Sequence, residues 1–137
     1  MKLVVAALAI ASACGPREAP LAWQTSETAA FARARSEHAA VMVETYASWS
    51  MPSVELDRRL HGEAAATALA GAFVPLRVDV SNSTDADQAL RDRYRITSEP
   101  AVVFVDADGT VLGRIDRLVE EPELVRAIAD AAGRRKR

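Results

Sequence analysis

Two patterns of hydrophobic residues alternate along this chain, and together they predict a layered α/β fold. Continuous apolar runs rich in β-branched residues at 40–47, 73–80 and 101–106 predict buried strands. The run at 40–47 is interrupted by one acid, Glu44, and is predicted to be a central parallel strand covered on both faces. A weaker run over 21–23 predicts a short edge strand at the start of the domain.

Between the strands, hydrophobic residues recur at helical spacing. The first helix is predicted to be capped by Thr25 or Ser26 and to run to about Glu37. Its predicted buried face consists of Ala29, Ala30, Phe31 and Ala34. A second helical stretch is predicted after Trp49, with a break at Gly62, an alanine-rich part over 63–69 and an end near Gly71. Further helices are predicted from a cap at 82–84 to Tyr94 and over 120–133. A tight turn at Asp108 and Gly109 leads into a last strand over 111–115, which predicts an antiparallel hairpin and the order β-α-β-α-β-α-β-β-α.

The composition fits a single soluble globular domain and excludes one class of partner. The 137 residues are 50% hydrophobic and 26% charged. A net charge of −2 lacks the basic excess that is typical of proteins that bind nucleic acid. Residues 133–137 form a basic tail, because four basic residues follow Gly133 at a predicted helix end. We interpret this tail as a frayed, solvated chain end, and contact with anionic lipid headgroups is the alternative.

The first fourteen residues fit a targeting segment better than a folded element. Lys2 precedes an unbroken apolar stretch, small residues follow, and the next residue is Cys14, the only cysteine in the sequence. Residues 1–13 are therefore predicted to be a signal peptide, which is too short to span a membrane as a helix. Residues 14–20, with two prolines, are predicted to be a tether, and residues 21–132 are predicted to be the folded domain.

The position of Cys14 resembles the lipobox of bacterial lipoproteins, although Ala11 stands where that motif most often has leucine. The resemblance implies that Cys14 carries a lipid, which would anchor the chain to a membrane surface. Two alternatives remain open. Ordinary cleavage near Ala13 would leave Cys14 as a free thiol, or Cys14 would act as a working thiol on a flexible tether.

Two separated motifs carry a second and more extensive resemblance. The first runs from Val41 to Ser53, VMVETYASWSMPS, and the second from Tyr94 to Gly109, YRITSEPAVVFVDADG. Both are similar to motifs of the thioredoxin family, and in particular of the C-terminal domain of DsbD-type thiol:disulfide interchange proteins. The resemblance covers nearly all of residues 21–132. It implies a thioredoxin-like three-layer α/β/α sandwich with a cis-proline, Pro100, before the fourth strand.

In this family, a Cys-x-x-Cys pair at the start of a helix performs disulfide exchange. Ser50 and Ser53 occupy the two cysteine positions here. The family's first cysteine attacks as a thiolate, and the second cysteine resolves the mixed disulfide. A helix dipole cannot ionise a serine hydroxyl near neutral pH, and oxygen cannot carry the two-electron disulfide couple. Disulfide exchange at this corner is therefore excluded, and no residue is predicted to be catalytic there.

Other chemistry at this corner lacks the groups that it needs. As a hydrolase nucleophile Ser50 would need a base, but His38 and His61 are not at a spacing that resembles a known triad. With two histidines and no thiolate partner, the sequence predicts no metal site, and it contains no cofactor motif. We therefore predict that Ser50 caps the helix and that Ser53 lies in its first turn.

The resemblance also implies roles for positions around the corner. Glu44 matches the family's buried acid, which helps to move protons during exchange. Without thiols we expect a structural or vestigial role for Glu44, and burial should raise its pKa. Pro100 matches a proline beside a groove that pairs with extended substrates. The groove predicted here consists of Trp49, Met51, Pro52, Glu99 and Pro100. Retention of Pro100 for structure alone is the alternative interpretation.

These observations favour a redox-inactive thioredoxin-like lipoprotein in the bacterial cell envelope, facing the periplasm. Its expected function is to bind proteins or peptides or to serve as a scaffold. The expected partners are exported proteins or peptides and a membrane reached through the N-terminal lipid anchor, with no nucleic acid. The enzymatic alternative is a thiol:disulfide reductase of the same family whose active-site cysteines are replaced by serine.

Overall fold

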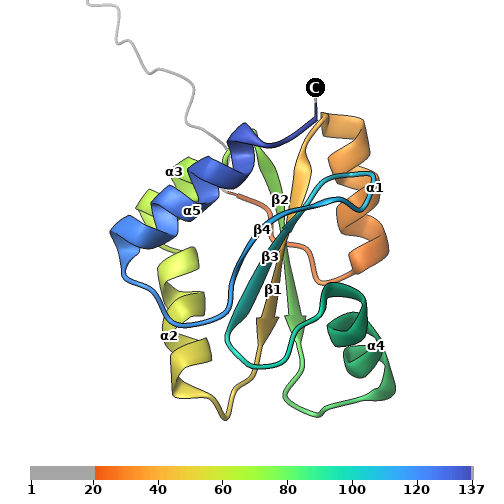
Figure 1. The fold of residues 1–137 in the computed structure, drawn as a ribbon, viewed down its shortest axis with the longest axis vertical. Helices are drawn as coiled ribbons and strands as arrows, with labels where there is room; N and C mark the ends of the chain where they lie inside the picture. The colour runs from red at the N-terminus through yellow and green to blue at the C-terminus, as the bar shows by residue number, and fades with distance from the viewer. Residues whose placement is uncertain (1–20, 137) are drawn as a thin grey trace, which may run out of the picture.

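The computed structural model describes residues 21–136, which form a four-stranded sheet with helices on both faces (Figure 1). The strands are β1 (Ala40–Tyr46), β2 (Phe73–Asp79), β3 (Ala101–Val105) and β4 (Val111–Ile115). Their order is β2-β1-β3-β4, with β2 parallel to β1 and the other neighbouring pairs antiparallel. The helices are α1 (Glu27–Glu37), α2 (Met51–Leu60), α3 (Glu63–Leu69), α4 (Asp85–Tyr94) and α5 (Glu121–Gly133). The predicted signal peptide, Cys14 and the predicted tether lie outside the described residues.

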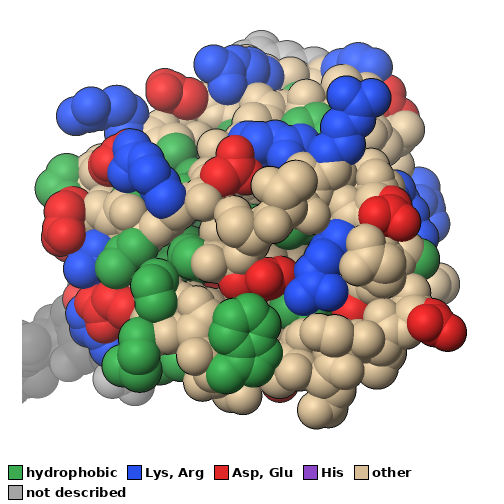
Figure 2. Space-filling view, turned by 60° about the horizontal axis from the view of Figure 1, so that its bottom comes forward, with side chains coloured by type: hydrophobic (Ala, Val, Ile, Leu, Met, Phe, Trp, Pro, Cys, Tyr) green, Lys and Arg blue, Asp and Glu red, His purple; other side chains and the backbone are tan. Residues whose placement is uncertain are grey.

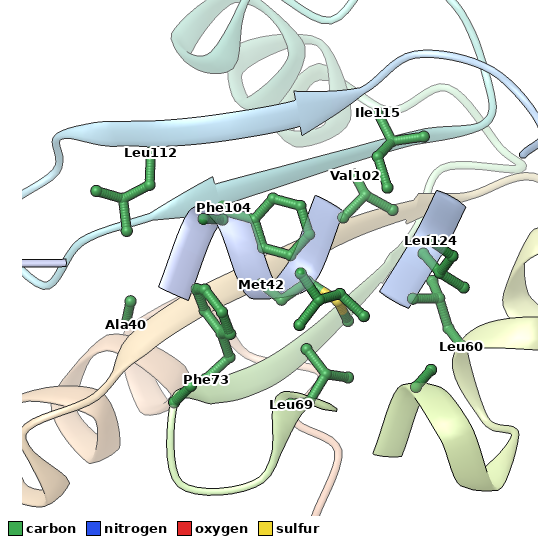
Figure 3. Packing of buried hydrophobic residues seen from close by; sticks show 14 of the residues in the cluster. Ala40, Met42, Leu60, Leu69, Phe73, Val102, Phe104, Leu112, Ile115 and Leu124 are labelled. Atoms are coloured by element: carbon green, nitrogen blue, oxygen red, sulfur yellow. The ribbon is translucent and has the colours of Figure 1, made fainter. Parts of the chain in front are cut away.

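Each face of the sheet carries its own hydrophobic core, which confirms the predicted three layers. In Figure 1, α1 and α4 cover one face, and α2, α3 and α5 cover the other. The central strand β1 serves both cores because successive side chains point to opposite faces. Met42 belongs to the core beside α2, α3 and α5, whereas Val41 and Val43 belong to the core beside α1 and α4. Figure 3 shows the first of these cores, in which the rings of Phe73 and Phe104 lie 5.1 Å apart at 55°.

Local polar signals place the helix starts where the sequence predicts them. Ser26 caps α1, and its side chain accepts a hydrogen bond from the backbone N–H of Ala29 at 3.3 Å. Thr84 caps α4 in a reciprocal capping box with Asp87. None of the helices within residues 21–136 is both long and apolar enough to cross a membrane.

The buried face of α1 is narrower than predicted. Ala30 and Ala34 are fully buried, and Phe31 is partly buried. Ala29 is exposed, so its predicted burial is wrong. The reason is geometric, because residues four apart lie on one helix face, and the face that includes Ala30 and Ala34 points to the sheet.

The edge strand predicted over 21–23 is also wrong. Only Gln24 bridges to β2, and its N–H donates to the carbonyl of Pro75 at 2.8 Å. Extension of this pairing toward the N-terminus would need an N–H from Pro75, which a proline lacks. The carbonyl of Ala22 instead accepts a hydrogen bond from Nη1 of Arg33 at 2.9 Å.

The residues that follow Gly133 are docked on the domain, so the predicted fraying is wrong for those that are described, while Arg134 and Lys136 remain exposed to solvent. Nη1 of Arg134 donates to a carbonyl of β4 at 3.1 Å, and Nη1 of Arg135 donates to the carbonyl before β2 at 3.2 Å. The ammonium group of Lys136 pairs with Asp108 in the turn between β3 and β4 at 2.6 Å. The two arginine side chains thus add hydrogen bonds to backbone carbonyls of β4 and of the residue before β2.

Candidate functional site

The corner between β1 and α2 is built as a helix cap. Ser50 has an extended backbone, with φ −102° and ψ 108°, and its Oγ accepts a hydrogen bond from the N–H of Ser53 at 3.4 Å. Ser53 is fully buried in the first turn, and its Oγ accepts a hydrogen bond from the N–H of Ala47 at 3.0 Å. Pro52 also lies in the first turn, where its missing N–H breaks no helical hydrogen bond. Both hydroxyls therefore support the backbone of the corner.

The described residues place no base beside Ser50. His38 ends α1 at the opposite end of the sheet, as the strand directions in Figure 1 show. His61 follows the last residue of α2, a ten-residue helix that spans about 15 Å. Within residues 21–136 there is also no cluster of three or more His, Cys, Asp or Glu side chains arranged to hold a metal ion. The geometry therefore gives Ser50 no partner for nucleophilic catalysis.

The loop after β2 fixes Trp49 in place at this corner. The indole Nε1–H of Trp49 donates to the carbonyl of Ser81 at 3.3 Å, and the N–H of Ser48 donates to the Ser81 hydroxyl at 2.9 Å. That hydroxyl donates to Asp79 at 2.5 Å, and its hydrogen bond lowers the pKa of Asp79. Sequence reasoning missed both Asp79 and Ser81, although an Asp-x-Ser step after a strand is a typical turn signal.

Trp49 and Met51 present apolar surface to solvent. Their exposed fractions are 63% and 74%, and Pro52 between Met51 and the buried Ser53 is exposed as well. Figure 2 brings this end of the molecule forward and shows hydrophobic side chains gathered beside acidic and basic ones. Large exposed apolar side chains that lie together are typical of interaction surfaces.

Glu99 and Pro100 lie at the start of β3, and their peptide bond is cis, as predicted. Pro100 is buried. The carboxylate of Glu99 accepts a hydrogen bond from Nε of Arg91 at 2.9 Å and forms an ion pair with its Nη2, also at 2.9 Å; the exposed fractions of the Glu99 and Arg91 side chains are only 9% and 14%. Arg91 therefore neutralises the charge that the sequence places beside the groove. The backbone N–H groups of residues 97–99 donate no hydrogen bond to any described residue.

Glu44 lies beneath the corner in β1 and is 1% exposed. Neither of its carboxyl oxygens has a hydrogen-bond partner among residues 21–136. Burial is the largest influence on its pKa, the neighbouring Asp57 acts in the same direction, and together they raise the pKa to about 9. Arg77 opposes this shift. The raised pKa confirms the expectation from burial, and Glu44 is neutral at physiological pH.

Asp57 of α2 connects this buried acid to the surface. Its Oδ1 lies 3.5 Å from Nη1 of Arg77 and 3.4 Å from Nδ1 of His61. The guanidinium of Arg77 lies over the ring of Tyr46, 3.7 Å from its centroid. The His61 ring stacks on Trp23, with centroids 4.2 Å apart. Two acids and one guanidinium thus link β1, β2 and α2 below the corner.

The family model for thioredoxin-like proteins matches residues 22–107 of this chain. The chain belongs to the thioredoxin-like family. The resemblance to DsbD-type proteins is also confirmed. The chain is 31% identical over 113 residues to thiol:disulfide interchange protein DsbD 1 of Pseudomonas aeruginosa, a match that covers 74% of this chain and 19% of that protein. It is 33% identical over 69 residues to DsbD of Ralstonia nicotianae, covering 50% of this chain and 11% of that protein. The chain thus spans a fifth or less of the length of these curated relatives.

Solved structures share the thioredoxin-like fold. The reduced C-terminal domain of Neisseria meningitidis DsbD aligns with a TM-score of 0.64 at 24% identity and covers 74% of this chain and 90% of that domain. A thioredoxin from Thermus thermophilus aligns with a TM-score of 0.69 at 24% identity, covering 80% and 85%. A DsbH oxidoreductase aligns with a TM-score of 0.73 at 20% identity, covering 85% and 88%. At these identities the likeness establishes the fold alone.

In this thioredoxin-like chain, the corner keeps its architecture without its thiols. Ser50 and Ser53 stand where the resemblance places the family's cysteines, and the only cysteine of the sequence, Cys14, precedes the described residues. The structure adds Asp57 and Arg91 to the predicted site residues. Asp57 had a sequence signal, because it follows Ser53 by four residues and so lies on the same helix face.

Proposed function

We propose that this chain is a redox-inactive thioredoxin-like module that binds extended segments of exported proteins or peptides in the bacterial cell envelope. A lipid on Cys14 holds it at a membrane that faces the periplasm. One observation carries the proposal: the corner is retained while oxygen replaces sulfur at both Ser50 and Ser53. Hydroxyl groups there support a helix but cannot form a mixed disulfide. Binding without electron transfer is the function that remains.

The surface around Trp49 supports binding of an extended segment. The hydrogen bond to Ser81 already restrains the Trp49 side chain, so little conformational entropy is lost when a partner packs on it. The unused N–H groups of residues 97–99, which precede β3, supply donors for an extended chain that lies beside this segment. Because Glu99 is paired with Arg91, it presents no unpaired carboxylate that would oppose the binding of an apolar or acidic segment.

Reduction of insulin disulfides tests the redox part of the proposal. The wild-type chain is expected to give no turnover, whereas the double variant Ser50→Cys with Ser53→Cys is expected to gain it, because only the thiols are missing. Measurable wild-type turnover would refute the redox-inactive assignment. Turnover that disappears in Cys14→Ser would assign the activity to the thiol at Cys14.

Recovery of bound proteins from envelope extract tests the binding part. We expect Trp49→Ala to lose the proteins that the wild type retains. Val111→Ala is the matched control, because Val111 is also an exposed hydrophobic residue, at 44%, and it lies at the start of β4. Identical recovery by the wild type and Trp49→Ala would show that this surface is not the binding site. Loss of membrane fractionation in Cys14→Ser tests the anchor separately.

The enzymatic alternative rests on the similarity to DsbD-type interchange proteins. It treats the chain as a protein-disulfide reductase whose two cysteines have been replaced by serine. The same insulin assay distinguishes the two proposals. A double-cysteine variant with full family activity, together with a wild type that retains no client protein, would favour this alternative.

A further inference from the structure

A cavity of about 530 Å³ opens at the end of the domain opposite to Ser50. Figure 1 shows the C-terminal ends of α1 and α5 beside the end of the chain, whereas the start of α2 lies at the other end of the molecule. The cavity walls come from the last turn of α1, the end of β3 and the residues after α5. Neither the corner nor the proposed binding surface uses any of these residues.

Two guanidinium groups line this cavity. Arg135 is held in place, because its Nε donates to the carbonyl of Ala132 at 3.3 Å and its Nη1 donates to the carbonyl of Ala72 at 3.2 Å. Its Nη2 has no acceptor among the residues that the structure describes. The side chain of Arg35, in the last turn of α1, has neither an ion pair nor a hydrogen bond within the same residues. The exposed His38 adds a ring beside them.

The charges that line the cavity do not cancel. Its one acid, Asp106, is already engaged, since Oδ1 accepts from the N–H of Ala107 and Oδ2 from the N–H of Lys136, both at 2.9 Å. The ammonium group of Lys136 is paired with Asp108. Two arginines therefore share the lining with a single carboxylate that is already hydrogen-bonded.

The helix ends explain only part of this basic cluster. The C-terminal ends of α1 and α5 carry negative partial charge, which favours cations nearby. This attraction accounts for the contacts of Arg135 with backbone carbonyls. It leaves Arg35 and the outer edge of Arg135 without a hydrogen-bonded partner in residues 21–136. These unused donors are the groups that an anion would bind.

We propose that this cavity binds the phosphate group of a small organic ligand, either a soluble phosphate ester or a phospholipid headgroup. Guanidinium groups bind phosphate through paired hydrogen bonds, and such bonds are stronger than those between neutral groups. The rest of the lining comes from small uncharged residues, Ala34, Ala39, Ala107, Ala132 and Gly133, which suit a small uncharged moiety attached to the phosphate. The cavity volume lies in the usual range for small-molecule sites, about 300–1,000 Å³.

Titration of the full ¹⁵N-labelled chain with glycerol 1-phosphate tests the site. We expect saturable shifts of the Ala107 and Gly133 amides and of the Arg135 Nε–H, with a dissociation constant at or below about 1 mM. Arg35→Gln is expected to weaken binding at least about tenfold, because it removes a charge-assisted hydrogen bond. The matched control is Arg126→Gln, which changes an exposed arginine of α5 outside the cavity and should leave the affinity unchanged.

Vesicles of phosphatidylglycerol, compared with vesicles of phosphatidylcholine, distinguish the two sources of phosphate. Weaker binding to phosphatidylglycerol by Arg35→Gln than by Arg126→Gln would identify a lipid headgroup, and this difference is independent of any N-terminal anchor. Saturable binding of glycerol 1-phosphate with equal vesicle binding by the two variants would identify a soluble ester. No saturable titration together with equal vesicle binding would overturn the proposal. Equal losses of glycerol 1-phosphate affinity in both variants would also overturn it.

Discussion

Replacement of Glu44 by glutamine should stabilise the domain and flatten the dependence of its stability on pH. Glu44 is 1% exposed, and its pKa is about 9 in the folded chain against an ordinary value of 4.5. Above pH 4.5 the unfolded chain releases this proton while the folded chain keeps it. Since the folded state then binds the extra proton, the free energy of unfolding falls as pH rises until the folded group also ionises near pH 9.

The magnitude follows from the size of the shift. Each pH unit between the two pKa values costs about 1.4 kcal/mol, so the penalty at pH 7 is about 3 kcal/mol. Glutamine has nearly the same shape and does not ionise. Glu44→Gln should therefore raise the free energy of unfolding by up to about 3 kcal/mol at pH 7. Below pH 4.5 the wild type and the variant should converge, because Glu44 is then neutral in both the folded and the unfolded chain.

Urea unfolding followed by circular dichroism between pH 5 and pH 9 measures this effect. The control is Glu63→Gln, which alters an exposed glutamate in the first turn of α3 and should change stability by less than about 0.5 kcal/mol. Asp57, Arg77 and His61 also face this region, so the quantity to compare is the difference in slope between the wild type and Glu44→Gln. A variant no more stable than the wild type at pH 8, or an unchanged slope, would refute the reasoning.

Three further predictions follow from contacts of the described residues. Ser53→Ala leaves the buried N–H of Ala47 without its acceptor and should cost about 1–3 kcal/mol in urea unfolding; a neutral result would show that the hydroxyl has no structural role. Asp57→Asn removes a neighbouring acid and should lower the pKa of Glu44, which carbon-detected NMR titration measures; an unchanged pKa would leave burial as the sole cause. Truncation after Gly133 removes the docked basic residues and should lower the free energy of unfolding by about 1–3 kcal/mol, whereas an unchanged urea midpoint would show that these contacts do not contribute.

The central sheet was predictable because its signals are local. Runs of β-branched residues indicate the buried strands, and Asp108 with Gly109 indicates the hairpin turn. The predicted edge strand failed for a reason that lies some fifty residues away in the sequence. Its pairing depends on the N–H groups of β2, and one of these is missing at Pro75. The docked C-terminal residues also depend on distant carbonyls, which no local pattern indicates.

The candidate site likewise contains residues that the sequence identifies and contacts that only the fold reveals. The motif identifies Ser50 and Ser53, because their spacing and position before a helix are properties of the sequence. Neutralisation of Glu99 by Arg91 depends instead on how α4 packs against the start of β3. The two residues are eight apart and follow neither helical nor strand periodicity, so the pair could be found only from the fold.

The buried hydroxyl of Ser53 determines how easily this position could accommodate a cysteine. Sulfur is a weaker hydrogen-bond acceptor than oxygen and is larger, so a cysteine at this fully buried position would be a poor acceptor for the Ala47 N–H. A Ser53→Cys substitution alone would therefore weaken the protein while providing no attacking thiolate at position 50. The packing around Ser53 thus disfavours sulfur at this position unless a cysteine at position 50 accompanies it.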